Sequence, residues 1–572
     1  MKTRNQFLSF AAIAALVCWA AQPGNAKVIY AVSCQFTDVS NAVAEASVGD
    51  VVQLPAGTNW WSETLNLNGV SLIGSGTNST VLIDEEPRAQ NVWQMINLTP
   101  ATGYFAEIAN IQFAAGVTNT TANFYGAIQV FGSPGSSWRI DHNVFNQLYA
   151  KGIVTTGNSM SLVDHNTFYE REISVSANSW AVNDGGGDIS WSSPPTYGPA
   201  STNCLYMEDN YITNTVGYVA SVGAMDGNTG SRVVFRHNTV WNDLFNNHGT
   251  ETEGRARSQR SFEIYDNTFN ATFGIFSAAL LRGGSGVVFS NTINGAFGSV
   301  AELRTYRYTC SYLDEWDPFG GANGLSLFDS NSPTLYLTGT NSAPNGSSYL
   351  QVNGANWTPN QWYGYTVLDT NSGIFSLITA NTANTIYYIG SSPTNAGAVA
   401  CTPLAFNVGD GFQIRRVYAS LDQIGRGSGN LLQDQQVVTS LTSILSDFPF
   451  FTAFPWLVSP TLGTSGVLTT INTYTGNTSW PNEVLEGVYV WGNTLDGVQT
   501  GVMSYYPTLQ LGRDFYNSAK PGYTPLVYPH PLQSETYVGI GAGGGPTNTP
   551  PPATNPPPTN GLQPPTNFHP IH

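Results

Sequence analysis

One short motif recurs along the chain and constrains its fold more than any other feature. Each copy is an apolar strand that ends close to an asparagine and is followed by a second apolar strand, as in WRIDHNVF and VVFRHNTV. The copies assign one asparagine to each unit, and these are Asn110, Asn143, Asn166, Asn210, Asn238, Asn267, Asn291 and Asn493. From Asn210 the next steps are 28, 29 and 24 residues. A repeat of this period predicts a solenoid in which each unit forms one coil.

The repeated asparagine also predicts how the coils stack. Asparagine tolerates tight turns, and its amide can hydrogen-bond the same amide one coil away, at about 4.8 Å. We therefore expect Asn238, Asn267 and Asn291 to form a straight file in a single-stranded right-handed parallel β-helix of the all-β class. The composition agrees, because only 10% of residues are charged while Gly, Asn, Ser and Thr are frequent, as is typical of strands and turns.

Composition and patterning divide the chain into five parts. A basic start and a short apolar run that ends in small residues predict a signal peptide, so we expect a secreted protein. No later run is long and apolar enough to span a membrane. Strand patterns joined by polar turns predict a small antiparallel β-domain inserted between coils. The predicted parts are the signal peptide at 1–26, the parallel β-helix at 27–331, the inserted β-domain at 332–418, a return to the β-helix with a closing segment at 419–540, and a Pro-rich disordered tail at 541–572.

Two further predictions concern the mature chain. Residues 40–46 predict a short amphipathic helix that covers the first coil, whose apolar interior would otherwise be exposed. Four cysteines follow the signal peptide, and in an oxidising compartment they allow three fully paired connectivities. They are Cys34, Cys204, Cys310 and Cys401, and none has the spacing of a metal site.

The net charge limits the partners. At −17 the protein lacks the positive surface on which nucleic-acid binding depends. The same charge opposes a polyanionic polysaccharide unless local arginines or a bound cation offset it. Such a local excess of arginine exists, because six of the sixteen arginines fall in one short region, as Arg255, Arg257, Arg260, Arg282, Arg304 and Arg307.

Spacing from the ladder asparagines brings two of these arginines together. Arg257 lies ten residues before Asn267, and Arg282 lies nine before Asn291. On adjacent coils their Cα atoms should be roughly 5 to 7 Å apart. Stacked like charges destabilise a fold unless an anion lies between them. That anion is either a glutamate of the same solvated loop or a ligand.

A uronate polysaccharide could use this region for β-elimination. The reaction neutralises the C6 carboxylate, removes the C5 proton and protonates the leaving oxygen, so it needs cationic clamps and a base. The predicted catalytic residues are Arg282, Arg257, Arg260 and His248, with the last three as candidate bases. Arg255 is a predicted substrate contact, and Trp191 and Tyr197 either stack on sugar rings or pack within their own loop. Glu251 and Glu253 are predicted to position the arginines or hold a Ca²⁺ ion.

Parts of the sequence resemble known families. VVQLPAG and VSLIGSG resemble the start of pectate-lyase-like proteins, and the repeats resemble bacterial secreted right-handed β-helix proteins. EIYDNTF and LLRGGSG resemble the ladder strand and the following Leu-Arg-His-Gly turn of β-helical lyases that cut alginate and dermatan. This resemblance implies an acid-side role for Arg282. Where that family has its catalytic lysine, this chain reads RARSQR, without a lysine.

A second constellation precedes the ladder asparagines. It comprises His142, His165, Asp209, His237 and Asp266, with Asp141, Asp164 and Glu208 beside them. Such a column could hold Ca²⁺, supply acid and base for hydrolysis, or be a solvated turn.

These features predict a monomeric, secreted protein that acts on extracellular polysaccharide, as a uronate lyase in preference to a glycoside hydrolase. The alternative is a non-catalytic glycan-binding or surface matrix protein, in which the inserted domain and the tail would serve as spacers.

Overall fold

The computed structural model describes residues 26–86, 94–118, 120, 123–180, 190–191, 194–217, 223–249, 258–304, 335–346, 349–362, 365–373, 375–388, 404–417, 424–427, 484–505, 509 and 511–534. The predicted signal peptide up to residue 25, the Pro-rich tail, Cys310 and Cys401 lie outside these residues. Cys34 and Cys204 are buried free thiols. Among the helices of the described residues, none is long and apolar enough to cross a membrane.

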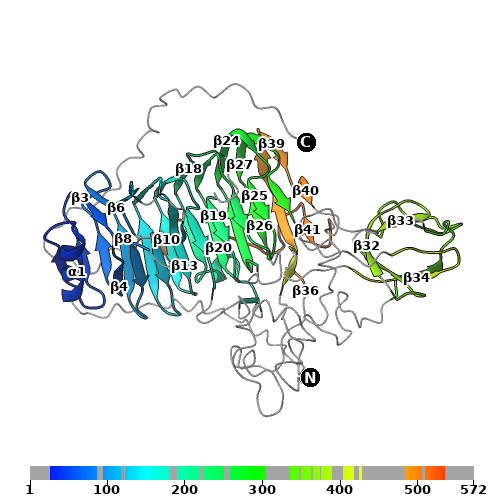
Figure 1. The fold of residues 1–572 in the computed structure, drawn as a ribbon, viewed down its shortest axis with the longest axis horizontal. Helices are drawn as coiled ribbons and strands as arrows, with labels where there is room; N and C mark the ends of the chain where they lie inside the picture. Colours follow the sequence, from blue (N-terminus) through cyan, green and yellow to red (C-terminus); the bar gives the residue numbers. More distant parts are fainter. Residues whose placement is uncertain are drawn as a thin grey trace, which may run out of the picture. The chain divides into compact units, whose positions relative to one another are not determined.

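Three long sheets form a stack of coils, and each complete coil contributes one strand to each sheet (Figure 1). We call the 12-stranded sheet A, the 11-stranded sheet B and the 10-stranded sheet C. The chain visits them in the order C, A, B, and neighbouring coils pair in parallel, as Leu205 with Val233 and Val233 with Phe262. The predicted fold class, an all-β parallel β-helix, is thereby confirmed.

The strands of each sheet follow in the order in which they pair. Sheet A contains β1 (Val28–Tyr30), β2 (Val51–Gln53), β5 (Ser71–Ile73), β8 (Phe105–Ala109), β11 (Ser137–Asp141), β14 (Met160–Asp164), β17 (Leu205–Glu208), β20 (Arg232–Arg236), β23 (Ser261–Tyr265), β26 (Ser285–Phe289), β37 (Val488–Trp491) and β41 (Phe515–Tyr516). Sheet B contains β3 (Gly57–Trp61), β6 (Thr80–Asp84), β9 (Gln112–Ala115), β12 (Val144–Asn146), β15 (Thr167–Glu170), β18 (Tyr211–Asn214), β21 (Thr239–Trp241), β24 (Thr268–Ile275), β27 (Thr292–Phe297), β38 (Asn493–Leu495) and β39 (Val498–Thr500). Sheet C contains β4 (Leu65–Asn68), β7 (Ile96–Thr99), β10 (Asn123–Phe131), β13 (Ala150–Thr156), β16 (Val175–Ala177), β19 (Met225–Gly227), β22 (Phe245–Asn247), β25 (Ala279–Leu281), β28 (Ala301–Leu303) and β40 (Ser504–Tyr505).

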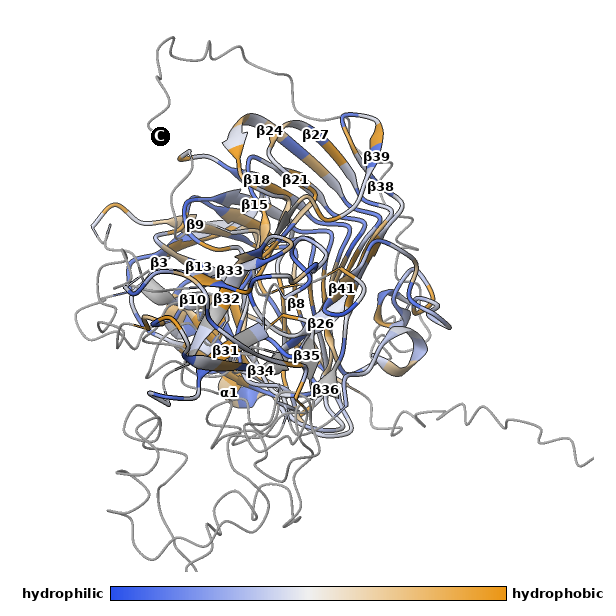
Figure 2. Ribbon diagram, turned by 90° about the vertical axis from the view of Figure 1, so that its right-hand side faces the viewer, coloured by the Kyte–Doolittle hydropathy of each residue, from blue (hydrophilic) through white to orange (hydrophobic). Residues whose placement is uncertain are grey.

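Figure 2 views the stack of coils end-on, with the ribbon coloured by hydropathy. Alternate side chains of the strands fill one interior that the three sheets enclose. Equivalent positions of successive coils stack, so the ring centroids of Phe113 and Phe145 are 5.2 Å apart and those of Phe145 and Phe168 are 4.6 Å apart. Helix α1 (Phe36–Glu45) packs against the first coil, where Phe36 meets the edge of Trp61. It begins four residues earlier than the helix predicted at 40–46.

A separate antiparallel sheet lies within residues 332–418. Its strands are β29 (Leu337–Thr340), β30 (Tyr349–Gln351), β31 (Tyr365–Asp369), β32 (Phe375–Asn381), β33 (Thr385–Tyr388) and β34 (Gly411–Val417). It has its own apolar cluster, which includes Leu350, Val367 and Ile414. A two-stranded antiparallel pair, β35 (Arg426–Gly427) with β36 (Val484–Leu485), precedes the return of the chain to sheet A at β37.

The asparagine file predicted from the repeat is present. Asn238 donates its backbone N to Asn267 Oδ1 at 2.9 Å and its Nδ2 to the same atom at 3.1 Å. The same pattern links Asn267 to Asn291. One predicted member is wrong, because Ile111 takes that position and donates its N to Asn143 Oδ1 at 3.0 Å. Asn110 lies one residue earlier.

The residue before each ladder position has a left-handed backbone. The φ angles lie between 51° and 62° for Asn110, His142, His165, Asp209, His237, Asp266 and Ser290. Asn, Asp and His adopt this conformation more readily than other non-glycine residues. The sharp turn from sheet A into sheet B explains why these residue types recur there.

A closing segment at residues 511–534 adds β41 to the end of sheet A and then packs on the outer side of that sheet. Its Leu526 and Leu532 join an apolar cluster with Tyr206, Tyr265 and Phe289, whose side chains point away from the coil interior. Tyr523 donates its hydroxyl to Glu263 Oε2 at 2.5 Å. Sheet A is therefore buried on both faces along this stretch.

Candidate active site

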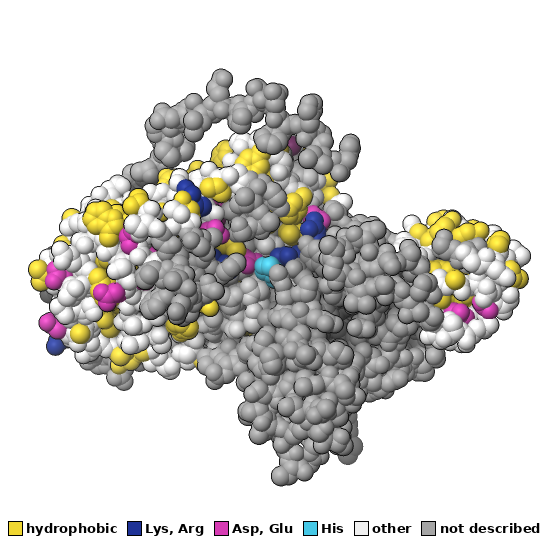
Figure 3. Space-filling view, in the orientation of Figure 1, with side chains coloured by type: hydrophobic (Ala, Val, Ile, Leu, Met, Phe, Trp, Pro, Cys, Tyr) yellow, Lys and Arg dark blue, Asp and Glu magenta, His cyan; other side chains and the backbone are white. Residues whose placement is uncertain are grey.

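The outer face of sheet C carries a column of aligned side chains. Pairing places Asn66, Asn97, Gln129, Val154, Ser176, Asp226, Asn246, Leu280, Glu302 and Ser504 beside one another on successive strands. Most members are polar, as expected where a sheet face points away from the core. In Figure 3 a histidine and several acidic and basic side chains gather near the middle of the visible face. Asp226, on β19, is the charged residue in the middle of the column.

The side chains of Lys151, Arg282 and His248 surround Asp226. His248 Nε2 lies 3.1 Å from Asp226 Oδ1, and the side chains are 27% and 3% exposed, respectively. Burial alone would raise the pKa of Asp226, but His248, Lys151 and Arg282 outweigh it and hold the pKa below its usual value. Asp226 is therefore an anion in this setting. Its carboxylate faces Nε2 of the partly exposed His248 ring.

Lys151 reaches this site from β13. Its Nζ donates to Ser176 Oγ at 3.1 Å. Burial lowers the pKa of Lys151, and the nearby carboxylates of Asp226 and Glu172 offset only part of that effect. An ammonium group with a lowered pKa releases a proton more readily than a solvated lysine.

Arg282 follows β25 and is held by the preceding coil. Its Nε donates to the Asn247 carbonyl oxygen at 2.5 Å and its backbone N donates to Asn247 Oδ1 at 2.5 Å. Its Nη2 donates to Asn246 Oδ1 at 3.1 Å. These contacts fix the guanidinium beside Asp226, while the side chain remains partly exposed.

A second charged pair lies further along the same face. Arg304 Nη2 and Glu302 Oε1 are 2.5 Å apart, and the guanidinium also lies over the ring of Phe276 at 5.2 Å. The charge of Glu302 is therefore balanced by Arg304. Asp226 is the carboxylate on which Lys151, His248 and Arg282 act.

The structure brings together two of the predicted catalytic residues, His248 and Arg282. Arg260 lies elsewhere, fully buried, with Nη1 2.7 Å from Glu486 Oε2. An arginine held in a buried ion pair is part of the packing, so Arg260 is not available as the base. Arg255, Arg257, Glu251 and Glu253 lie outside the described residues.

The two aromatic residues predicted to stack on sugars are enclosed. Trp191 is fully buried and donates its Nε1 to the Ser258 carbonyl oxygen at 2.8 Å. The Tyr197 hydroxyl bonds Ser285 Oγ at 2.7 Å, beside sheet A. The two alternatives for these residues were stacking on sugar rings and packing, and their contacts agree with packing.

Two residues of the cluster, Asp226 and Lys151, were not among the predicted site residues. Their sheet C strands carry no ladder asparagine that would mark register in the sequence. The available signal was the rarity of lysine, because Lys151 is one of only three lysines after the predicted signal peptide.

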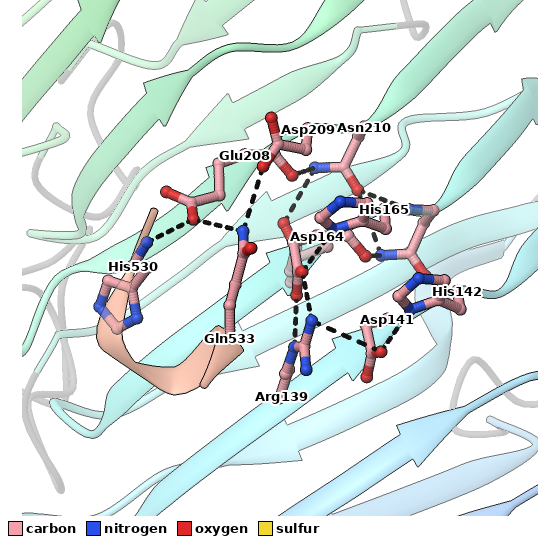
Figure 4. A network of polar contacts seen from close by, with 12 residues as sticks. Arg139, Asp141, His142, Asp164, His165, Glu208, Asp209, Asn210, His530 and Gln533 are labelled. Atoms are coloured by element: carbon pink, nitrogen blue, oxygen red, sulfur yellow. Dashed lines mark hydrogen bonds and ion pairs between the residues drawn. The ribbon is translucent and has the colours of Figure 1, made fainter. Parts of the chain in front are cut away.

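The second predicted constellation lies at the edge between sheets A and B (Figure 4). Arg139 donates to Asp164 through Nε at 2.8 Å and Nη2 at 2.6 Å. Asp141 Oδ2 lies 2.6 Å from His142 Nδ1, and Asp164 Oδ2 lies 2.7 Å from His165 Nδ1. These carboxylates are already engaged by cations and imidazoles, which disfavours the Ca²⁺ interpretation.

Glu208, in the same column, is covered by the closing segment. It accepts from the His530 backbone N at 2.8 Å and from Gln533 Nε2 at 2.6 Å (Figure 4). Across the described residues, no group of three or more His, Cys, Asp and Glu side chains is arranged to hold a metal ion.

No family model matches the sequence, and no curated protein matches it. Among solved structures, an alginate lyase from Paenibacillus sp. str. FPU-7 is 10% identical, with a TM-score of 0.29, over 49% of this chain and 99% of its own. The catalytic unit of a GH87 α-1,3-glucanase from Streptomyces thermodiastaticus strain HF3-3 is 14% identical, with a TM-score of 0.27, over 47% of this chain and 58% of its own. A family 28 exopolygalacturonase from Yersinia enterocolitica is 11% identical, with a TM-score of 0.21, over 49% of this chain and 76% of its own. At such scores, the function of this chain has to be argued from its own residues.

Proposed function

We propose that this protein is a polysaccharide lyase that cleaves uronate chains by β-elimination on the outer face of sheet C. The observation that carries the proposal is the convergence of Lys151, His248 and Arg282 on one buried carboxylate, Asp226, in a chain of net charge −17. A local cationic cluster in an acidic protein suits an anionic sugar. The signal peptide predicted from the sequence supports an activity outside the cell, and we expect the protein to act as a monomer.

Each of these three side chains has a task in this reaction. Arg282, fixed by Asn247, would bind the C6 carboxylate and stabilise the negative charge that develops when C5 loses its proton. His248 would take that proton through Nδ1, because its Nε2 faces Asp226. The C5–H electrons form the C4=C5 double bond as the C4–O bond breaks. The ammonium of Lys151 would protonate the departing oxygen, which its lowered pKa favours.

Hydrolysis has weaker support on this face. Among the described members of the sheet C column, Asp226 and Glu302 are the carboxylates, and three strand spacings separate them. That is about 14 Å, whereas the paired carboxyls of glycosidases lie about 5 to 9.5 Å apart. Glu302 is also held by Arg304.

The test is to incubate the purified full-length protein with alginate, pectate and glycosaminoglycans, with and without Ca²⁺, while absorbance is recorded near 230 nm. The Ca²⁺ arm addresses the predicted role of Glu251 and Glu253. A rise in absorbance that His248→Gln reduces by about a hundredfold or more supports the proposal. Arg171→Ala is the control, because Arg171 binds the Tyr149 hydroxyl and Gln147 and is not among the cations that act on Asp226.

Two results would contradict the proposal. New reducing ends without a rise in absorbance would indicate hydrolysis. Binding to an immobilised polymer, with flat absorbance for every substrate, would favour the non-catalytic glycan-binding protein.

A further inference from the structure

The outer face of sheet B differs from the outer faces of the other two long sheets. The closing segment packs on sheet A, and the candidate active site lies on sheet C. On sheet B, the interior side chains of β15, β18 and β21 include Phe168, Ile212 and Val240, so the residues on either side of them point outward. The same alternation continues through β24 and β27. We call the two outward columns, from Thr167 to Thr292 and from Tyr169 to Asn294, the sheet B surface.

Strand pairing places three aromatic residues close together on this surface. Tyr211 lies in the first column, between two threonines of the neighbouring strands. Tyr169 and Trp241 lie in the second column, on either side of Thr213. Tyr169 and Trp241 are therefore two strand spacings apart, about 10 Å, with Tyr211 beside them on the strand between.

The side chains of the sheet B surface are all able to form hydrogen bonds, and none of them is charged. Apart from the three aromatic residues, the two columns hold only threonine and asparagine. In a chain of net charge −17, these columns contain no carboxylate and also no cation that could balance an acidic sugar. The surface therefore matches an uncharged partner that carries many hydroxyl groups.

The polar atoms of the three aromatic residues face solvent. The three side chains are partly exposed, and no described residue hydrogen-bonds the Tyr169 hydroxyl, the Tyr211 hydroxyl or Trp241 Nε1. Burial raises the pKa of Tyr211, and the neighbouring Tyr169 hydroxyl adds to the rise. Further along the second column, Asn294 Nδ2 donates to Asn270 Oδ1 at 3.1 Å, which holds these two amides in line.

We propose that the sheet B surface binds a neutral polysaccharide, whose chain runs along the stack across strands β15 to β27. Sugar rings carry C–H groups on their faces and hydroxyls at their edges, so they pack on aromatic rings and hydrogen-bond to threonine and asparagine. The surface spans four strand spacings, from β15 through β18, β21 and β24 to β27, which is about 19 Å. The site is distinct from the candidate active site and does not depend on the proposed lyase activity.

A protein partner fits this surface less well. The buried centre of a protein interface is depleted in charge but is rich in apolar side chains, and arginine is frequent in it. The two columns contain neither an aliphatic side chain nor an arginine. Their combination of aromatic rings, hydroxyls and amides instead suits a sugar.

Trp60 provides a matched control on the same sheet. It is 60% exposed, and it lies on β3 at the start of the stack, outside the sheet B surface. The next residues of its column are Ile83 and Ala114, which offer no side-chain hydroxyl or amide. An exposed indole is thus present there without the polar neighbours that the proposal requires.

The experiment is native affinity electrophoresis of the full-length protein in gels that contain hydroxyethylcellulose, xyloglucan or galactomannan, all of which are neutral. We expect at least one polymer to retard the parent protein. Trp241→Thr should weaken this binding by about tenfold, and Tyr169→Thr/Tyr211→Thr/Trp241→Thr should abolish it. Threonine already occupies these columns on neighbouring coils, so these variants should fold, which circular dichroism checks. Trp60→Thr and Arg282→Ala should bind as the parent protein does.

Several results would overturn the proposal. They are the absence of retardation of the folded parent protein by all three polymers, equal retardation of the triple variant, and a loss of binding in Trp60→Thr or Arg282→Ala as large as that in the triple variant. Sedimentation of the parent protein as a dimer and of the triple variant as a monomer would assign the surface to a second copy of the chain, which also contradicts the proposal.

Discussion

Asn291 hydrogen-bonds Asn493 in the same way as it is itself bound by Asn267 on the preceding coil, although 202 residues separate Asn291 from Asn493. The Asn291 backbone N donates to Asn493 Oδ1 at 3.0 Å and its Nδ2 donates to the same oxygen at 2.8 Å. Asn493 Nδ2 in turn donates to the Val288 carbonyl oxygen at 2.9 Å. The chain thus leaves the stack after β28 and returns to it in register.

We expect Asn493→Ala to destabilise the protein by about 2 to 4 kcal/mol, because it leaves buried backbone and amide groups of Asn291 without acceptors. Denaturant unfolding followed by circular dichroism measures the change. Asn294→Ala removes a partly exposed amide contact to Asn270 on sheet B and should cost less than about 1 kcal/mol. Equal effects of the two substitutions would show that the ladder adds nothing special.

Arg236 joins sheet A to the closing segment. It donates from Nε to Glu208 Oε2 at 2.6 Å and from Nη1 to the Leu526 carbonyl oxygen at 2.8 Å, and both charged side chains are fully buried. Arg236→Met leaves the Glu208 carboxylate buried without its cation, so we expect a loss of about 3 to 5 kcal/mol. Limited proteolysis should then cut within 511–534 faster than in the parent protein. The double variant Glu208→Gln/Arg236→Met should recover part of the loss, and no recovery would contradict this explanation.

Glu170 and Asp243 form a buried carboxyl pair. Among the described groups, no other hydrogen-bond partner contacts Glu170 Oε2 or Asp243 Oδ2. A proton shared between the two carboxyls would satisfy both oxygens. Burial and the neighbouring Asp243 hold the pKa of Glu170 well above its usual value, and burial raises the pKa of Asp243 to about 6. Because both folded-state pKa values exceed those of unfolded carboxyls, the pair stabilises the fold fully at acidic pH. That stabilisation is lost as the pH rises through about 6.

Unfolding free energies measured from pH 5 to pH 8 should therefore contain a falling component, of up to about 1.4 kcal/mol per pH unit for each proton. Glu170→Gln supplies an amide donor to Asp243 and should flatten this dependence. Glu63→Gln, at an exposed position, should leave it unchanged. A Glu170→Gln profile parallel to that of the parent would argue against a shared proton.

Lys151 should determine the alkaline limb of the activity profile, because a general acid must be protonated to act. Its pKa is lowered by burial, so activity should fall at a pH below the ordinary range for lysine. Lys151→Arg keeps the charge and should move the alkaline limb upward while lowering kcat. Lys151→Met should lower kcat by about a hundredfold with little change in KM. An unchanged pH–rate profile in Lys151→Arg would exclude Lys151 as the acid.

The fold could be predicted because an asparagine recurs at the same position of almost every coil. The single error, at Asn110, has a physical origin. The ladder position and the left-handed position before it both favour asparagine, so an isolated Asn in AEIANIQF fits either. Hydrogen bonding to Asn143 distinguishes the two positions, and that contact is visible only in the structure.

The candidate site was predicted in part. His248 and Arg282 lie near ladder asparagines, so their coil positions could be counted from the sequence. Asp226 and Lys151 lie on strands whose register is not marked in this way. Arg260 was predicted as a candidate base from the local excess of arginine, and Trp191 was left open between sugar stacking and packing. Neither residue type nor local composition distinguishes an outward side chain from one enclosed by a neighbouring segment, and both residues are buried.

The separation between Asn291 and Asn493 also has a kinetic consequence. Coils from β1 to β28 contact mainly their immediate neighbours, so they can assemble progressively from short-range pairings. The pairing of β26 with β37 instead requires closure of a long loop, and the entropic cost of that closure precedes the favourable contacts between the two strands. We therefore expect the end of the stack to form last during folding, with the edge of β26 uncovered until then and open to pairing with another chain.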